Sequence, residues 1–153
     1  MVDVVLRQAR IDDVPAIVGL LADDGLGKGR EDASLPLDHA YVSAFEALDG
    51  DPNQLLLVAQ DGDSIVGTMQ LTFIAGISRR GAWRGQIEAV RVAASHRGGG
   101  LGQHMFEFAI GEARSRGCSL VQLTSDKTRD DAHRFYDRLG FVASHVGYKL
   151  KLD

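Results

Sequence analysis

The sequence predicts an α/β protein in which a mixed, mostly antiparallel sheet of six to seven strands carries helices on both faces. Three observations support this class. The chain of 153 residues is long enough for one domain with a substantial core and short for two, so a single domain over residues 1–153 is expected. With 44% hydrophobic and 25% charged residues, the composition is typical of a soluble globular protein. Strand-like and helix-like patterns alternate along the chain, without a linker or an internal repeat.

The first half of the chain predicts one strand, two helices and a hairpin. Residues 2–9 read as the strand, and residues 12–24 as a helix with a proline in its first turn, where a missing N–H does no harm. A second helix is expected over residues 36–48, where apolar side chains recur at helical spacing. Two β-rich runs, residues 54–60 and 65–77, flank a polar turn and are therefore expected to pair as antiparallel neighbours.

The second half predicts two further strands and two helices before the C-terminal segment. Residues 81–92 have the pattern of a strand, and residues 101–116 that of a long helix, closed by a glycine that tolerates a positive φ. The apolar run at residues 119–125 predicts another strand, and residues 129–140 a short helix. The alternating residues 142–152 are expected to end the chain as one strand or two.

A glycine-rich stretch, Arg-Gly-Gly-Gly-Leu-Gly at residues 97–102, connects a predicted strand to the long helix. Helix N-termini expose unpaired N–H groups and the positive end of the helix dipole, and glycines let an anion approach the main chain closely. The stretch therefore predicts a phosphate site. A Walker loop is excluded, because Gln103 and His104 follow the last glycine in place of Lys and Ser or Thr. A dinucleotide-binding fingerprint fails at its third glycine.

The pattern R-x-x-G-x-G at residues 97–102 resembles the pyrophosphate-binding loop of the GCN5-related N-acetyltransferases (GNAT), which bind acetyl-coenzyme A (acetyl-CoA). Residues 130–141, with the sequence DDAHRFYDRLGF, resemble the helix-to-strand signature A-x-x-F-Y-x-x-x-G-F of the same family. The similarity extends in outline over nearly the whole chain. The resemblance implies the GNAT fold and an acetyl-CoA-dependent N-acetyltransferase. Such an enzyme moves the acetyl group directly to a primary amine in a ternary complex, without an acyl-enzyme or a metal.

The resemblance also implies how acetyl-CoA is held. Main-chain N–H groups of the glycine stretch would bind the pyrophosphate, and the pantetheine arm would pair like an extra strand with main-chain groups of Val90 and Val92. In the family a bulge separates this strand from the next one, here residues 119–125, and opens the space for the arm. Family members often carry an Asn where this chain has Arg129, so Ser125 or Arg129 is expected to make that contact. The residues implied to hold acetyl-CoA are Val90, Arg91, Val92, Arg97, Gly98, Gly99, Gly100, Leu101, Gly102, Gln103, Ser125 and Arg129.

Tyr136 is the candidate catalytic acid. It matches the family tyrosine that approaches the coenzyme sulfur, and a phenol can protonate the leaving thiolate. The alternative is a structural role, because Tyr136 shares a helical apolar stripe with Ala132, Phe135 and Leu139.

Glu88 is the candidate catalytic base. It interrupts an apolar strand nine residues before Arg97, where some sugar-amine members of the family carry a Glu. A carboxylate is a weak direct base for an alkylammonium, so a water relay is expected. The alternatives are an ion pair with Arg84 or Arg91, or an edge position that faces water.

In the family the segment between the first two helices frames the acceptor, and here it comprises residues 21–36. Its carboxylates could attract a cationic amine, although Lys28 and Arg30 argue against a simple acidic site, and a solvated loop is the alternative. Its glycines suggest closure on the substrate. Trp83 either packs at a strand end or lends its ring to the acceptor pocket. The candidates for acceptor binding are Asp23, Asp24, Glu31 and Trp83.

Three alternatives to a small-molecule acetyltransferase stay open. A protein N-terminus or lysine could be the acceptor, the chain could sense acetyl-CoA without turnover, or an unrelated fold could bind phosphate. A homodimer through residues 142–152 is also expected from the family.

Composition limits the partners and the location. The net charge of -4, from 17 basic and 21 acidic residues, lacks the positive balance of a nucleic-acid binder. The sequence shows no apolar run of the roughly 18 residues that a membrane helix needs, and its first residues lack a signal-peptide pattern, so we expect a cytoplasmic protein without a membrane partner. The single cysteine, Cys118, excludes an internal disulfide and is expected to be a buried, inert thiol. His96 and His104 are expected to face solvent.

Overall fold

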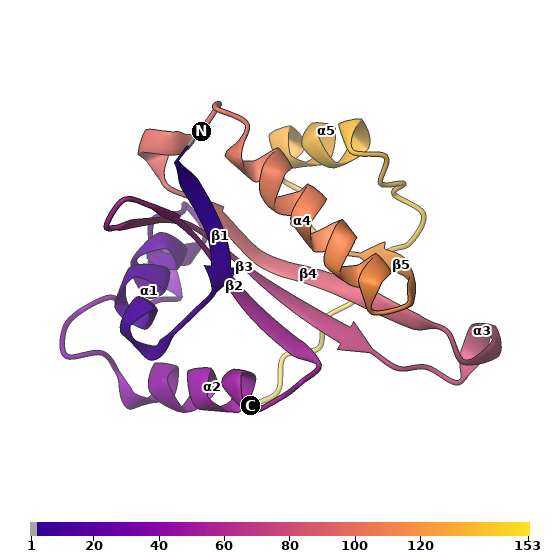
Figure 1. The fold of residues 1–153 in the computed structure, drawn as a ribbon, viewed down its shortest axis with the longest axis horizontal. Coiled ribbons are helices and arrows are strands. Elements are labelled where there is room, and N and C mark those ends of the chain that lie inside the picture. The colour runs from indigo at the N-terminus through magenta and orange to yellow at the C-terminus, as the bar shows by residue number, and fades with distance from the viewer. Residues whose placement is uncertain (1–2) are drawn as a thin grey trace. The chain divides into compact units, whose positions relative to one another are not determined.

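In the computed structural model, which describes residues 3–153, the chain forms two compact units (Figure 1). The first unit extends to Gln122, and the second runs from Leu123 to Asp153.

The first unit is built on a sheet of five strands that follow one another in chain order. The first four strands pair antiparallel, and the fifth pairs parallel with the fourth. The mixed, mostly antiparallel α/β class is confirmed, although the described residues hold five strands and not the expected six to seven. The strands are β1 (Val4–Gln8), β2 (Gln54–Asp61), β3 (Ser64–Ile74), β4 (Trp83–Val92) and β5 (Cys118–Gln122).

The three helices that the sequence predicts for the first unit lie close to their expected positions, and four short helical segments were not predicted. The second helix begins later than residue 36, because the Asp38 side chain caps it by accepting the Ala40 N–H at 2.9 Å. The segments are η1 (Ile11–Asp13), α1 (Val14–Ala22), η2 (Gly27–Gly29), α2 (His39–Asp49), α3 (Ser78–Gly81), η3 (Ala94–His96) and α4 (Leu101–Ser115).

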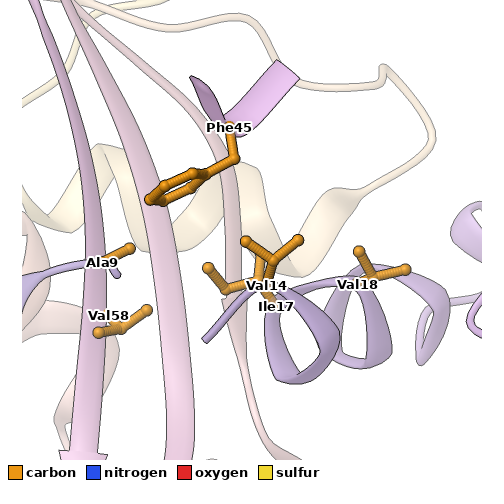
Figure 2. Close-up of a cluster of buried hydrophobic side chains, with 6 residues drawn as sticks. All are labelled: Ala9, Val14, Ile17, Val18, Phe45 and Val58. Atoms are coloured by element: carbon orange, nitrogen blue, oxygen red, sulfur yellow. The ribbon is translucent and has the colours of Figure 1, made fainter. Parts of the chain in front are cut away.

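Helices cover both faces of this sheet, as expected (Figure 1). On one face, α1 and α2 pack through a buried apolar cluster (Figure 2), which comprises Ala9, Val14, Ile17, Val18, Phe45 and Val58. On the other face, Gly67 of β3 packs closely against α4. A β-carbon built on Gly67 would stand 3.0 Å from the sulfur of Met105 and would also contact Ala59. Val58 and Ala59 are neighbours on β2 and therefore point to opposite faces of the sheet. Helices α1 and α2 thus cover the face of Val58, and α4 covers the face of Ala59.

The second unit contains helix α5 (Asp130–Arg138), which ends before Gly140 at a φ of 94°. Residues 142–152 form no strand in this unit, contrary to expectation. Their alternation is real, but a strand needs a neighbouring main chain to bond with, and Val146, Tyr148 and Leu150 are 78%, 93% and 86% exposed. The expected homodimer through these residues stays a prediction.

Within residues 3–153, every helix falls short of the length and apolar character that a membrane crossing requires. The same residues contain no group of three or more His, Cys, Asp or Glu side chains placed to hold a metal ion.

Candidate functional site

Strand β4 carries a β-bulge near its C-terminal end. Thr68 of β3 pairs with Arg91, but Gln70 pairs with Glu88, so two β4 residues, Ala89 and Val90, lie opposite one residue of β3. Ala89 has a φ of 55°, a left-handed conformation that is uncommon outside glycine. The family resemblance implies a bulge in this strand, but nothing in the sequence places it at this alanine.

Beyond the first half of β4, its edge on the β5 side is open in the sense that it has no strand partner within residues 3–153. Among the described residues, β5 pairs with β4 only as far as Gln86. Ala93 N–H donates to Val66 O at 2.8 Å, so the alternation of an antiparallel ladder turns the N–H and C=O of Val92 away from β3. Val92 therefore turns its main-chain groups toward this edge, where its N–H could bond an added extended ligand while its C=O accepts from Arg97 Nε at 3.1 Å.

The glycine stretch follows directly and leads into α4. Gly98 and Gly100 have φ of 81° and 88°, and Gly100 is the N-cap of α4. A β-carbon built on either glycine would meet no atom within 4 Å, so the side of the loop that side chains would occupy is open. The N–H groups of Leu101, Gly102 and Gln103 lie in the first turn, which lacks intrahelical acceptors. The loop thus combines open space, free main-chain donors and a helix N-terminus.

Two arginines flank Val92, and both contact β4 carbonyls. Arg91 Nη1 donates to Val90 O at 2.8 Å, and Arg97 Nε donates to Val92 O at 3.1 Å. Each also faces an aspartate from the end of α1. Arg91 Nη2 lies 2.9 Å from Asp24 Oδ2, whereas Arg97 Nη2 lies 3.8 Å from Asp23 Oδ2. The structure therefore pairs the aspartates expected for the acceptor with arginines expected for acetyl-CoA.

The third carboxylate expected to bind the acceptor, Glu31, also has a partner in the chain. Tyr41 OH donates to Glu31 Oε1 at 3.0 Å and accepts the Asp32 N–H at 3.0 Å. The N–H of Asp32 favours the phenolate, but burial and the Glu31 carboxylate outweigh it and raise the pKa of Tyr41. Lys28 and Arg30, by contrast, are exposed.

Glu88 lies on β4 immediately before the bulge, and its side chain is exposed. Gln86 Nε2 approaches Glu88 Oε1 at 3.4 Å. Of the alternatives raised by the sequence, the water-facing edge position is the one that the structure contains, and Arg91 turns to Asp24. An exposed carboxylate beside the open edge can exchange protons through water.

Trp83 and Cys118 lie at the other end of β4. Trp83 is the first residue of the strand and 38% exposed, and Glu88 lies five positions, or about 17 Å of strand, further along. It lies at a strand end and is not brought to the bulge. Cys118 pairs with Trp83 across the sheet, and burial raises the pKa of its thiol against the opposing effect of Arg116. Cys118 is half-buried and not fully buried as expected, and the effect of burial on its pKa outweighs that of Arg116.

His96 is half-buried and not fully exposed to solvent as expected. Its Nε2 lies 2.7 Å from Asp61 Oδ2, and Ser95 Oγ lies 2.8 Å from its Nδ1, at the start of the glycine stretch. These side chains and Arg97 line a shallow polar depression. No local pattern in the sequence indicates this contact, because it joins the end of β2 to η3 across 35 positions. His104 is exposed, as expected.

The remaining candidates belong to the second unit. Tyr136 is half-buried and packs edge-on against Phe135 at 5.7 Å and Phe141 at 6.1 Å between ring centroids. Arg129 is the N-cap residue of α5, and Ser125 precedes a turn in which Thr128 N–H donates to Asp126 Oδ1 at 2.9 Å. The contact with Phe135 agrees with the apolar stripe that the sequence predicts, whereas Phe141 was not part of that stripe.

Comparison with known proteins gives the class of this fold and site. A family model described as "Acetyltransferase (GNAT) family" matches residues 24–141. The match covers more than half of the chain, which therefore belongs to this family. The predicted family and the predicted enzyme class, an N-acetyltransferase, are confirmed.

Individual relatives agree with this class. Over 147 residues, the chain is 31% identical to an aminoalkylphosphonate N-acetyltransferase of Salmonella typhimurium, covering 96% of this chain and 90% of the relative. It is 36% identical over 88 residues to a glucosamine 6-phosphate N-acetyltransferase of Trypanosoma brucei brucei, covering 58% of each chain. A crystal structure from Bacillus halodurans, titled a transcriptional regulator, superposes with a TM-score of 0.95 at 46% identity, covering 97% of this chain and 99% of the other.

Proposed function

We propose that this protein, acting as a single domain over residues 1–153, transfers the acetyl group of acetyl-CoA directly to the primary amine of a small molecule within a ternary complex. The observation that carries the proposal is the continuity of the bulged, open edge of β4 with the glycine stretch at the start of α4. Such an edge suits an extended pantetheine arm, and the helix start suits its diphosphate. The family match runs across both units, which supports one functional domain.

The residues of the first unit fit acetyl-CoA as a co-substrate. Val92 offers its main-chain N–H at this edge, while its C=O accepts from Arg97, and Gly98 to Gln103 offer N–H groups to the diphosphate. Arg97 is more than half exposed and can add a positive charge. In the second unit, Ser125 and Arg129 are proposed to contact the pantetheine where the family often uses an Asn.

Transfer requires an amine that has lost a proton and a thiolate that gains one. We assign the first proton to Glu88, through water, and the second to Tyr136. A main-chain N–H near Val90, beside the bulge, is the proposed donor to the carbonyl oxygen as it becomes negative.

The acceptor is proposed to be a small amine that also carries a phosphonate or phosphate group. The named substrates of two relatives are of this kind. Within residues 21–36, Asp23, Asp24 and Glu31 already have partners in the chain, while Lys28 and Arg30 are exposed. The charges of the segment that lack an ion-pair partner in the described chain are thus two cations, Lys28 and Arg30, which suit an anionic group, and two carboxylates, Glu31 and Asp32.

A thiol-release assay with a matched amine panel tests the proposal. Short aminoalkylphosphonates and amino-sugar phosphates are compared with the same amines lacking the phosphorus group, and the phosphorus-bearing members are expected to react faster. Calorimetric titration of CoA into the intact chain measures binding separately. Heat on titration without thiol release from any amine would refute turnover, and no heat would refute the CoA site.

Variants assign the two catalytic residues. Glu88→Gln and Tyr136→Phe are expected to lower kcat at least about tenfold while CoA affinity stays within about twofold. Glu107→Gln and Tyr148→Phe, the same changes at exposed positions, serve as matched controls and should match the wild type. Unchanged kcat in a catalytic variant would remove that residue from the mechanism.

A regulatory use of bound acetyl-CoA is a second candidate, because the structure with 46% identity is titled a transcriptional regulator. In that case CoA binds to the wild type and to Glu88→Gln and Tyr136→Phe alike, and none of them releases thiol with the panel.

A further inference from the structure

The guanidinium of Arg91 joins two elements beside the bulge. Nη1 donates to Val90 O at 2.8 Å, and Nη2 pairs with Asp24 Oδ2 at 2.9 Å. Because a guanidinium is planar and its N–H groups point in fixed directions, the position of the carboxylate determines where the other N–H groups point. Asp24 therefore constrains the peptide group of Val90.

Asp24 is itself held by its own loop. Its second carboxylate oxygen, Oδ1, accepts the Leu26 N–H at 3.3 Å, and its main-chain oxygen accepts the Lys28 N–H at 2.9 Å. Gly27, which lies between them, fits so closely that a β-carbon there would stand 1.9 Å from Leu21 O. The loop after α1 thus presents the carboxylate in one orientation.

The neighbouring pair lacks these properties. Asp23 and Arg97 are 3.8 Å apart, with side chains 62% and 56% exposed, so solvent screens their attraction. Asp24 and Arg91 are 13% and 17% exposed, so loss of either charge leaves the other poorly hydrated. Two adjacent aspartates thus provide one well-held contact to β4 and one weak contact.

We propose that Asp24 is a positioning residue for the acetyl-CoA-binding strand, acting through Arg91, although it lies in the segment that frames the acceptor. The inference rests on the proposed CoA site. By holding Arg91 on Val90 O, Asp24 maintains the bulge, and the bulge turns the main-chain groups of Val92 toward the open edge. The loop after α1 and the CoA-binding strand are then coupled, so a change in the loop alters CoA affinity.

Titration of CoA into Asp24→Asn and Asp23→Asn tests this coupling, because the same change is made at adjacent positions. Asp24→Asn is expected to weaken CoA binding about tenfold, the scale of one charge-assisted hydrogen bond, and Asp23→Asn to leave it within about twofold. Thermal melting fixes an assay temperature at which each variant is folded. Equal CoA affinities in the two variants would overturn the proposal, as would an Asp24→Asn effect confined to the KM of the amine.

Arg91→Lys keeps the positive charge but loses the planar guanidinium that bonds two acceptors at once. This variant tests the proposal even if Asp24→Asn does not fold. It is expected to weaken CoA binding to a similar extent, and wild-type affinity in this variant would overturn the bridging role. Asp24→Glu retains the carboxylate and is expected to recover part of the affinity lost in Asp24→Asn. Absence of CoA binding in the wild type would refute the proposed function itself, which separates that failure from a failure of the coupling.

Discussion

Ala89→Gly should stabilise the protein, although the same change in an ordinary strand destabilises it. Ala89 is exposed and has a φ of 55°, so its methyl group contributes little packing and forces a strained backbone. Strain of this kind costs about 1–2 kcal/mol for a residue with a β-carbon. Glycine removes it but costs about 0.5–1 kcal/mol in backbone entropy. The free energy of unfolding should therefore rise by about 0.5–1 kcal/mol.

Ala93→Gly is the matched control, since Ala93 lies four positions further on with an ordinary φ of -58°. This variant should lose about 0.5–1 kcal/mol, so the two changes should have opposite signs. Urea unfolding followed by circular dichroism measures both, provided that the m-values agree. If Ala89→Gly, like Ala93→Gly, unfolds at a lower urea concentration than the wild type, the left-handed conformation of Ala89 is not a source of strain.

Three further predictions concern stability and reactivity. The Arg7 guanidinium, bonded to Asp13 at 2.7 and 2.9 Å, lowers the pKa of that carboxyl against the effect of burial. Asp13→Asn should therefore cost about 2–3 kcal/mol at pH 7. Because the folded pKa lies below the unfolded value, this difference from the wild type should hold above pH of about 4 and shrink in urea titrations as the pH falls further. Gly27→Ala should cost about 1–3 kcal/mol, since its β-carbon would stand 1.9 Å from Leu21 O, while Gly25→Ala, with no atom within 4 Å, should show little loss in the same unfolding assay. Burial raises the pKa of the Cys118 thiol, so its alkylation by iodoacetamide should be slower than that of a free thiol at pH 8 and should accelerate at higher pH; a rate equal to that of free cysteine would contradict this.

Features set by neighbouring residues could be predicted from the sequence. The glycine stretch needs positive φ values and a helix start, both of which are local, and Gly98, Gly100 and α4 lie where the pattern placed them. The bulge could not be placed in the same way, because alanine is not a bulge signal and only the register of β4 on β3 reveals it. The contact of His96 with Asp61 and that of Arg91 with Asp24 join distant positions, so they depend on the folded chain.

The difference between local features and contacts of distant residues also applies to the charge of residues 21–36, the segment that frames the acceptor. Counted along the sequence, the loop after α1 is acidic, which suggests attraction for a cationic amine. In the fold, Arg97 and Arg91 face Asp23 and Asp24, and those partners come from β4 and the glycine stretch. The remaining charges within residues 25–32 are two positive, on Lys28 and Arg30, and two negative, on Glu31 and Asp32, so their sum is zero. A neutral segment does not repel an anionic acceptor, whereas an acidic one would, so the folded charge balance favours an amine that carries a phosphonate or phosphate group.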